Sequence, residues 1–162
     1  MFNIGIITAS DKGSRGERED ASGRLIATMM SELGEIKSYK VLADDVDLIS
    51  RELIVMADTL GLDLILTTGG TGMSPRDVTP EATLAVVDRQ VPGIPEAMRA
   101  RSLQITSRAM LSRAVAGMRG RTLIINLPGS PKGVQECLEV ILPALEHGLA
   151  IMKGEAVECA RH

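Results

Sequence analysis

The stretch LILTTGGTGMSPRDVTPEAT, residues 64 to 83, gives the strongest indication of the fold of the chain. Its apolar beginning belongs to a short run, LDLILTT at 62–68, of the kind that forms a buried strand. Three glycines follow at 69, 70 and 72, then Asp77, and Pro80 stands where a first helical turn is expected. A buried strand that leads through a glycine-rich loop into a helix is typical of α/β proteins with a parallel sheet.

The same order of apolar strand, loop and helix repeats along the chain. We expect further strands at 2–8, at 39–45 and in the first half of 121–133. Apolar residues at helical spacing predict helices near 20–33, near 48–60, within 80–118 and from 134 onward, with 107–119 ambiguous. Pro143 predicts a kink, or a second helix that begins at Leu142 or Pro143.

The predicted fold is a single α/β domain of three αβα layers around a mostly parallel sheet with right-handed crossovers. We assign residues 1–153 to this domain and 154–162 to a polar C-terminal tail. Ligands of such sheets bind beyond the carboxyl ends of the strands, near the point where the strand order reverses. The loops SDKGSRG, ADDVD, GGTGMSPRD and LPGSPKG are expected to meet there.

Composition and charge narrow the classes of partner. The aromatic share of 1%, the net charge of −3 and the sequence pI near 5.4 argue against binding to a nucleic-acid backbone. No apolar run approaches the roughly 20 residues of a membrane span, and no leader is recognisable, so the cytoplasm is the expected location. Cys137 and Cys159 fit neither a disulfide framework nor a metal site and are interpreted as free thiols.

The glycines of the third loop predict a cradle for a small anion. Gly69, Gly70 and Gly72 permit positive backbone torsions, so several N–H groups can point at one phosphate. The loop lacks the lysine of a Walker motif and the spacing of the dinucleotide fingerprint. The alternative is a tight strand-to-helix turn whose glycines are purely structural.

Two aspartates make the ligand hypothesis stronger. Asp44 and Asp77 follow strands predicted to end at the same edge of the sheet, and carboxylates beside a phosphate cradle are a usual site for Mg²⁺. The structural alternatives are an ion pair of Asp77 with Arg76 and a helix cap by either aspartate. Asp45 or Asp47 could take the place of Asp44 in either role.

Two other loops carry candidate polar contacts. Ser10 and Asp11 stand in a charged first loop that could touch a phosphate or could simply be solvated. The late loop offers Asn126, Gly129 and Ser130 beside Lys132 as a second polar or anionic surface. Its alternative is a loop made rigid by its two prolines.

The chain resembles the molybdenum cofactor biosynthesis family, which includes the bacterial molybdopterin adenylyltransferases and the gephyrin-like G domains of two-domain proteins. The resemblance is carried first by TTGGTGMSPRDVTPEAT at 67–83. Three more segments are similar to the family: SDKGSRGEREDASG at 10–23, DRQVPGIPEAMRARSL at 88–103 and INLPGSPKG at 125–133. It spans roughly residues 3 to 153.

The resemblance implies an adenylyl transfer from ATP to the terminal phosphate of molybdopterin, with Mg²⁺ and release of pyrophosphate. It implies catalytic and metal-binding roles for Asp44 and Asp77. The nucleotide site would contain Ser10, Asp11, Gly69, Gly70, Thr71 and Gly72. The pterin site would contain Ser102, Asn126, Pro128, Gly129 and Ser130.

The resemblance also implies a homotrimer that has small-molecule substrates and makes transient contact with a molybdenum-insertion enzyme. A sister group of uncertain transferase activity shares Thr-Gly-Gly-Thr-Gly but commonly lacks the RDVTPEAT segment, which is intact at 76–83 here. The alternative function is a molybdopterin-binding or carrier protein without catalysis.

Overall fold

The structure, a computed structural model, describes residues 1–155. Cys159 and most of the predicted tail therefore lie outside the described residues. A single six-stranded sheet runs through the molecule in the order β2-β1-β3-β6-β5-β4. Its strands are β1 (Phe2–Ala9), β2 (Gly34–Leu42), β3 (Leu64–Thr68), β4 (Arg89–Gln90), β5 (Ala116–Arg119) and β6 (Thr122–Leu127).

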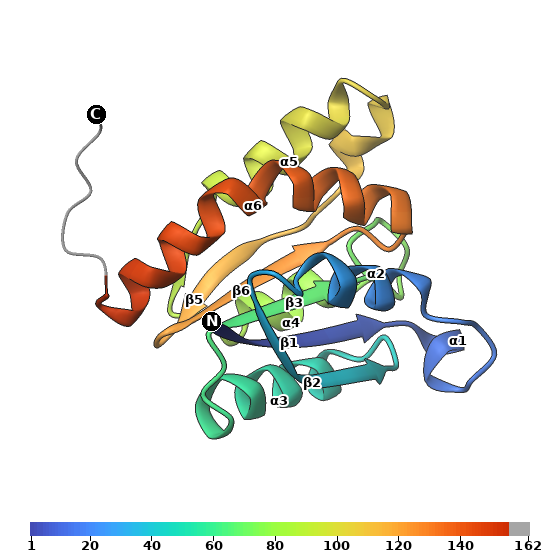
Figure 1. The fold of residues 1–162 in the computed structure, drawn as a ribbon. Helices are drawn as coiled ribbons and strands as arrows, with labels where there is room; N and C mark the ends of the chain where they lie inside the picture. The colour runs from blue at the N-terminus through green and yellow to red at the C-terminus, as the bar shows by residue number, and fades with distance from the viewer. Residues whose placement is uncertain (156–162) are drawn as a thin grey trace.

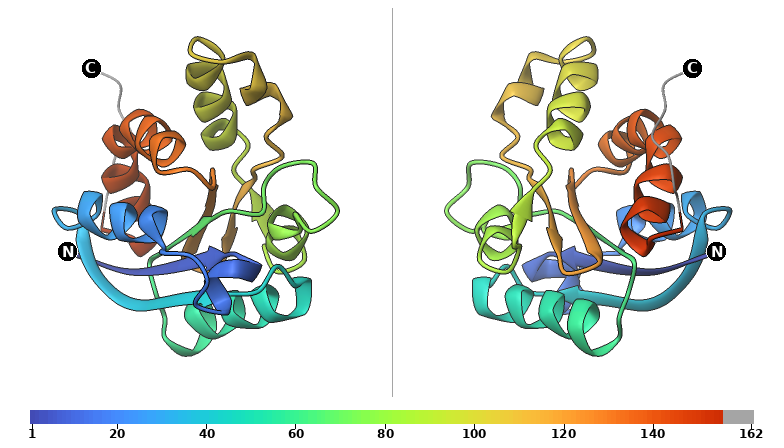
Figure 2. Two further views of the ribbon diagram at one scale, coloured as in Figure 1. Left: turned by 90° about the vertical axis from the view of Figure 1, so that its right-hand side faces the viewer. Right: turned by 90° about the vertical axis from the view of Figure 1, so that its left-hand side faces the viewer.

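Helices cover both faces of the sheet, so the predicted three-layer architecture is confirmed (Figure 1). One face is covered by α2 (Ala21–Met29), α5 (Gly93–Leu103) and α6 (Pro131–Lys153). The other is covered by α3 (Val46–Ile54), which continues into a π-helical turn η1 (Val55–Thr59), and by α4 (Thr79–Leu84). Figure 2 shows the sheet lying between these two layers.

The core divides into two apolar clusters because the central strands are buried on both faces. Ile4, Ile6 and Leu66 point into the cluster under α2, α5 and α6. Ile7 and Ile65 point into the cluster under α3 and α4. Side chains of adjacent strand residues alternate between faces, so a central strand that is covered twice must be apolar at nearly every position.

The segment 80–118 differs from its predicted helical character. It contains α4 and α5, but also a 3₁₀ turn η2 (Ser107–Leu111) and the two antiparallel strands β4 and β5. Small buried residues explain the missed strand: Gly117 lies so close to the chain at Arg89 that a Cβ would be 2.9 Å from its carbonyl oxygen. Such a strand has no strong apolar alternation for a sequence pattern to detect.

Helix α6 is continuous through Pro143, so the prediction of a second helix beginning at Leu142 or Pro143 is wrong. Pro143 is exposed, and the carbonyl that its missing N–H leaves free can therefore bond to water. Ile141 and Leu145 are buried on either side of it, and their packing on the sheet holds the helix together.

The four predicted loops do meet at one edge. Strands β2, β1, β3 and β6 run parallel, so their carboxyl ends and the loops that follow lie together. The chain passes from β1 outward to β2 and then returns to the opposite side of β1 for β3. The strand order therefore reverses between β1 and β3, where such sheets bind ligands.

Asn126 ties this edge together from inside. Its side chain is fully buried, and its amide donates to the hydroxyls of Thr67, at 3.0 Å, and Thr83, at 2.9 Å. Its carbonyl oxygen accepts from the Val115 N–H at 3.2 Å. One residue thus links β6 to β3, to α4 and to the segment that precedes β5.

We expect Asn126→Leu to lower the free energy of unfolding by about 2 to 4 kcal/mol, because the buried Val115 N–H loses its acceptor and the hydroxyls of Thr67 and Thr83 lose a donor. Urea denaturation measures the difference. Gln135→Leu, on the exposed face of α6, is the control and should change stability by no more than about 0.5 kcal/mol. Equal stabilities of the two variants would contradict the structural role of Asn126.

Candidate active site

A cleft of about 620 Å³ opens at the point where the strand order reverses. We call it the acidic cleft, because three aspartates line it. The ends of β1 and β3 form its floor, and the loop before α6 forms one wall. Its lining includes Ser10, Asp20, Asp44, Gly69, Gly70, Asp77, Gly129 and Ser130.

Asp44 and Asp77 both line this cleft, and neither is used as a helix cap. The cap of α3 is Asp45, whose carboxylate accepts from the Leu48 N–H at 2.9 Å. Helix α4 begins after Val78 and has no side-chain cap. The two capping alternatives are therefore not realised, and both carboxylates are available to the cleft.

Arg76 pairs with Asp11 rather than with Asp77. Its guanidinium donates to both oxygens of the Asp11 carboxylate, at 3.0 and 2.9 Å. Asp11 and Asp44 also bond reciprocally, since the backbone N–H of each donates to the carboxylate of the other at 3.0 Å. The loops after β1, β2 and β3 are thus joined through Asp11. Asp11 itself lines neither the acidic cleft nor the pocket next to it.

The charges in the cleft oppose the ionisation of Asp44. Burial raises the pKa of the Asp44 carboxyl above its ordinary value, and the nearby carboxylates of Asp11 and Asp77 raise it further. The Asp11 N–H and the Arg76 guanidinium offset part of this effect on the Asp44 pKa. The opposite holds for Asp11, where the hydrogen bond from Arg76 is the main cause of a lowered pKa. A cation between Asp44 and Asp77 would relieve their repulsion.

The glycine turn at the end of β3 requires glycine at two positions. Gly69 and Gly70 have φ values of 88° and 68°, in the left-handed region. A Cβ at Gly69 would lie 2.4 Å from the Ala9 carbonyl oxygen, and one at Gly70 would lie 2.3 Å from Thr79 Oγ1. The turn therefore presses against β1 on one side and against the start of α4 on the other.

Thr79 places an unused polar atom beside this turn. Its side chain is fully buried, and within residues 1–155 its Oγ1 has no hydrogen-bond partner. The point where a Gly70 Cβ would sit is 3.3 Å from Asp44 Oδ1 as well as close to Thr79 Oγ1. Thr79 lines neither the acidic cleft nor the pocket next to it, so its hydroxyl adds polarity behind the glycine turn, close to Asp44, rather than a ligand within the cleft.

The donor set suits a metal that shares its coordination with a substrate. In the described part of the chain, no three His, Cys, Asp or Glu side chains group in a way that could hold a metal ion. Two carboxylates that face one cleft fit Mg²⁺, which proteins usually hold by one or two carboxylates together with substrate phosphates and water.

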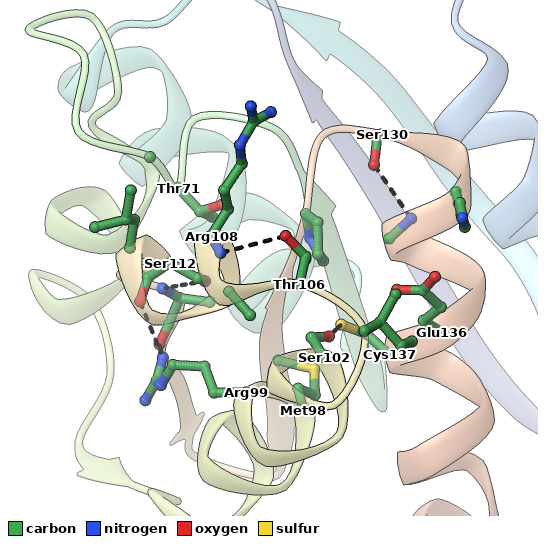
Figure 3. A pocket seen from close by; sticks show the side chains of 18 residues that line it. Thr71, Met98, Arg99, Ser102, Thr106, Arg108, Ser112, Ser130, Glu136 and Cys137 are labelled. Carbon is green, nitrogen blue, oxygen red and sulfur yellow. Dashed lines mark hydrogen bonds between the residues drawn. The ribbon is translucent and has the colours of Figure 1, made fainter.

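A second pocket, of about 520 Å³, adjoins the acidic cleft (Figure 3). We call it the neighbouring pocket. It lies between α5, the 105–112 segment and the first turns of α6. Arg99, Arg108 and Lys132 bring positive charge to its lining and Glu136 brings one negative charge, while Met98, Ile105 and Leu111 give it apolar walls. Cys137 is buried on α6, with its Sγ 3.9 Å from Ser102 Oγ.

The two hollows share a wall. Ser130 lines both, and its hydroxyl caps α6 by accepting from the Gly133 N–H at 3.1 Å. The late loop is held by Ser22, whose hydroxyl donates to the Gly129 carbonyl at 2.7 Å. It lies directly against the glycine turn, since a Cβ at Gly129 would be 3.4 Å from the Gly69 Cα.

Most of the predicted site residues line the acidic cleft or the neighbouring pocket. The predicted nucleotide residues do not all line one of them, however, and neither do the predicted pterin residues. Gly69 and Gly70 line the acidic cleft, whereas Thr71 and Gly72 line the neighbouring pocket. Ser102 and Pro128 line the neighbouring pocket, whereas Gly129, which is assigned with them to the pterin site, lines the acidic cleft. Two predicted residues line neither hollow: Asp11, which is paired with Arg76, and Asn126, whose side chain is enclosed between β3, β6 and α4.

Several lining residues are not marked by the sequence pattern. Asp20 has the appearance of a cap of α2, which it is, but it also accepts from the hydroxyls of Thr8, at 2.7 Å, and Tyr39 and lines the acidic cleft. Arg99 and Arg108 are not predicted, because the resemblance of 88–103 assigns a role to Ser102 alone and the 107–119 segment carries no motif. The concentration of arginine between 99 and 113 is the signal that could have found them.

Comparisons with known proteins identify the family of the chain. A family model described as a probable molybdopterin binding domain matches residues 5–147. The molybdopterin adenylyltransferase of Helicobacter pylori strain J99 is 45% identical over 160 residues, which cover 97% of this chain and 91% of that protein. Gephyrin of Dictyostelium discoideum is 44% identical over 94% of this chain, but only 23% of gephyrin is covered.

Solved structures show the same likeness in three dimensions. The molybdopterin biosynthesis enzyme MoaB of Thermus thermophilus is 51% identical, with a TM-score of 0.91 over 98% of this chain and 100% of the other. Both the sequence match and the fold extend over nearly the whole chain. The chain therefore belongs to the molybdenum cofactor biosynthesis family, whose domain is described as a probable molybdopterin binding domain.

Proposed function

We propose that this chain is a molybdopterin adenylyltransferase, which transfers AMP from ATP to the terminal phosphate of molybdopterin. The observation that carries the proposal is the shared wall: a cleft with two carboxylates and a glycine turn meets a basic pocket at Ser130. A reaction that joins two phosphorylated substrates needs two such sites in contact.

The acidic cleft would take the triphosphate of ATP. Backbone N–H groups of the turn at Gly69 and Gly70 would approach its oxygens, since neither residue carries a side chain of its own. The N-terminus of α6, a helix of 23 residues that begins after Ser130, adds a favourable potential for negative charge. Asp44 and Asp77 would hold Mg²⁺, which would neutralise charge on the phosphates.

The neighbouring pocket would take molybdopterin. Arg99, Arg108 and Lys132 offer charge to its terminal phosphate, and the apolar walls suit the flat pterin. In the reaction, an oxygen of this phosphate attacks the α-phosphorus of ATP. One P–O bond forms there, the bond from the α-phosphorus to the bridging oxygen breaks, and its electron pair leaves with pyrophosphate.

The chain's own contribution is orientation and charge. The late loop is tied down by Ser22 and by Thr68, whose hydroxyl donates to the Pro128 carbonyl at 2.6 Å, so the wall between the two substrates is rigid. A fixed wall keeps the attacking oxygen and the α-phosphorus in line, and such positioning is a large part of phosphoryl-type catalysis.

The alternative is a carrier that binds molybdopterin without transferring AMP. This alternative is supported by the neighbouring pocket alone, and it needs neither Asp44 nor Asp77. Purified chain with ATP, Mg²⁺ and molybdopterin should release pyrophosphate and form adenylylated molybdopterin, detected by coupled assay and mass spectrometry. Bound molybdopterin with no pyrophosphate would decide for the carrier.

We also propose that the chain assembles as a homotrimer and works in the cytoplasm. An apolar groove of α5, β5 and α6, lined by Val91, Ile94, Val140, Leu145 and Ile151 among others, supports contact between copies. None of the helices in residues 1–155 has the length and apolar character to cross a membrane. Sedimentation equilibrium should give the mass of three chains, and a monomer at micromolar concentration would contradict this assembly.

Asp77→Asn and Asp44→Asn should each lower the rate of pyrophosphate release by roughly 100-fold or more. Each variant lacks one of the two negative carboxylates that would hold Mg²⁺ and, through it, orient the triphosphate. Molybdopterin affinity, measured by fluorescence quenching, should be unchanged. Asp47→Asn is the matched control, since Asp47 is an exposed residue of α3 that lines neither hollow. Wild-type rates in the first two variants would remove the carboxylates from the mechanism.

Asp44→Asn should also make the metal-free protein more stable at neutral pH. The folded state raises the pKa of Asp44, so between the unfolded and folded pKa values the native state binds more protons. Stability therefore falls as pH rises through this window, and asparagine removes that penalty. Thermal unfolding in EDTA should show a gain at pH 7 that shrinks as the pH is lowered. A gain that is absent at pH 7, or equal at all pH values, would contradict the raised pKa.

A further inference from the structure

Arg113 is a residue to which neither the sequence pattern nor the proposed mechanism gives a role. It stands between η2 and β5 and lines neither the acidic cleft nor the neighbouring pocket. Its side chain nevertheless reaches the loop that carries Asp77. Any influence on the reaction must therefore pass through the residues that it holds.

Four contacts join Arg113 to the segment that runs from Thr71 into α4. Its backbone N–H donates to the Thr71 carbonyl at 2.9 Å. Its guanidinium donates to the carbonyls of Gly72 and Asp77, each at 2.7 Å, and pairs with the Glu81 carboxylate. One planar group thus bonds to both ends of the turn 72–77 and to the helix that follows.

Apart from Arg113, one side chain of the turn anchors it: Arg76 bonds to the Asp11 carboxylate and so ties the turn to the loop after β1. Met73, Ser74, Pro75 and Arg76 are exposed and contribute nothing to either apolar cluster. Within the turn, the Asp77 N–H donates to the Ser74 carbonyl, and the Ser74 N–H donates to Asp77 Oδ2, both at 2.9 Å. These bonds set the local shape of the turn, whereas Arg113 fixes where the whole turn lies relative to β5.

Arg113 is itself held from the side of the neighbouring pocket. Arg99, which lines that pocket, donates to the Ala114 carbonyl at 2.9 Å and to the Ser112 carbonyl at 3.4 Å. The backbone on both sides of Arg113 is therefore bonded to a residue of the second substrate site.

We propose that Arg113 is a positioning residue that places the Asp77 carboxylate and the glycine turn for the metal–ATP complex. The inference rests on the proposed metal role of Asp77. Lysine cannot replace it, because an ammonium group lacks the rigid fork that bonds two carbonyls and a carboxylate at once. The loop would then sample positions in which Asp77 no longer faces Asp44.

The experiment compares Arg113→Lys with Arg119→Lys, which keep the charge. Arg119 is a matched control: like that of Arg113, its guanidinium makes three hydrogen bonds, one to the Val86 carbonyl at 2.8 Å and two to the Asp58 carboxylate. It lies on β5 and lines neither hollow. Both variants lose similar bonds, so a general loss of stability should be comparable.

The first readout is Mn²⁺ binding in the presence of a non-hydrolysable ATP analogue, followed by electron paramagnetic resonance. Arg113→Lys should weaken Mn²⁺ binding by about 10-fold, the usual scale for residues that orient a metal ligand, and Arg119→Lys should leave it unchanged. The second readout is the Mg²⁺ concentration that half-saturates pyrophosphate release. It should rise by a similar factor in Arg113→Lys, while the KM for molybdopterin stays the same.

Equal Mn²⁺ affinities in the two variants would overturn the proposal, as would losses of activity that follow stability with no change in Mg²⁺ dependence. If wild-type chain releases no pyrophosphate, the transferase function fails, but the Mn²⁺ comparison still tests the position of Asp77. If the wild type binds no Mn²⁺ with the analogue, the metal role of Asp77 falls and this inference falls with it.

Discussion

The register between β1 and β3 is the constraint on which the site depends. Thr8 lies opposite Thr68, so the chain leaves both strands at the same level, and the Ala9 carbonyl lies against the turn at Gly69. A shift of one residue would turn every side chain of the strand to the other face and expose its apolar set. The burial that fixes the fold therefore also fixes the distance between the first loop and the glycine turn.

The acidic cleft shows how a binding site departs from the most stable arrangement. Asp44 is held by the Asp11 N–H, yet it is partly desolvated and lies near two other carboxylates. Arg76 could relieve Asp77 but is committed to Asp11. Nearby, Thr79 keeps a buried hydroxyl without a partner in the described residues. Each feature costs some stability, and the proposed cation with its phosphates would offset part of that cost.

Much of this could be predicted because the strongest signals are local. The apolar run at 62–68 and the glycines that follow are sufficient to predict a parallel strand and the glycine turn after it. Because parallel strands end at a common edge, the convergence of Asp44 and Asp77 follows from topology alone. The choice of Asp45 rather than Asp44 as the cap of α3 could not be predicted, since both aspartates precede the helix and only the backbone geometry separates them.

The features that the sequence did not predict depend on contacts between residues that lie far apart in the chain. Asn126 has the appearance of a polar residue at a strand end, and only the packing of Thr67 and Thr83 around it shows an enclosed amide. β5 is short, with Ala116 and Gly117 in its interior, so its pairing with β6 leaves little pattern to recognise. Arg113 has no motif of its own, because its significance comes from carbonyls some 36 to 42 positions earlier in the chain.

Ser130 has two structural roles, and they limit which residues of this protein could be substituted to change its specificity. The residue forms part of two compartments and also stabilises the first turn of the longest helix. Selecting variants for a different acceptor should therefore spare position 130 and begin at the opposite side of the basic compartment, at Ile105, Ala109 or Leu111. Those side chains line one compartment only, so under the proposed reaction the recognition of one reactant could change while that of the other is kept.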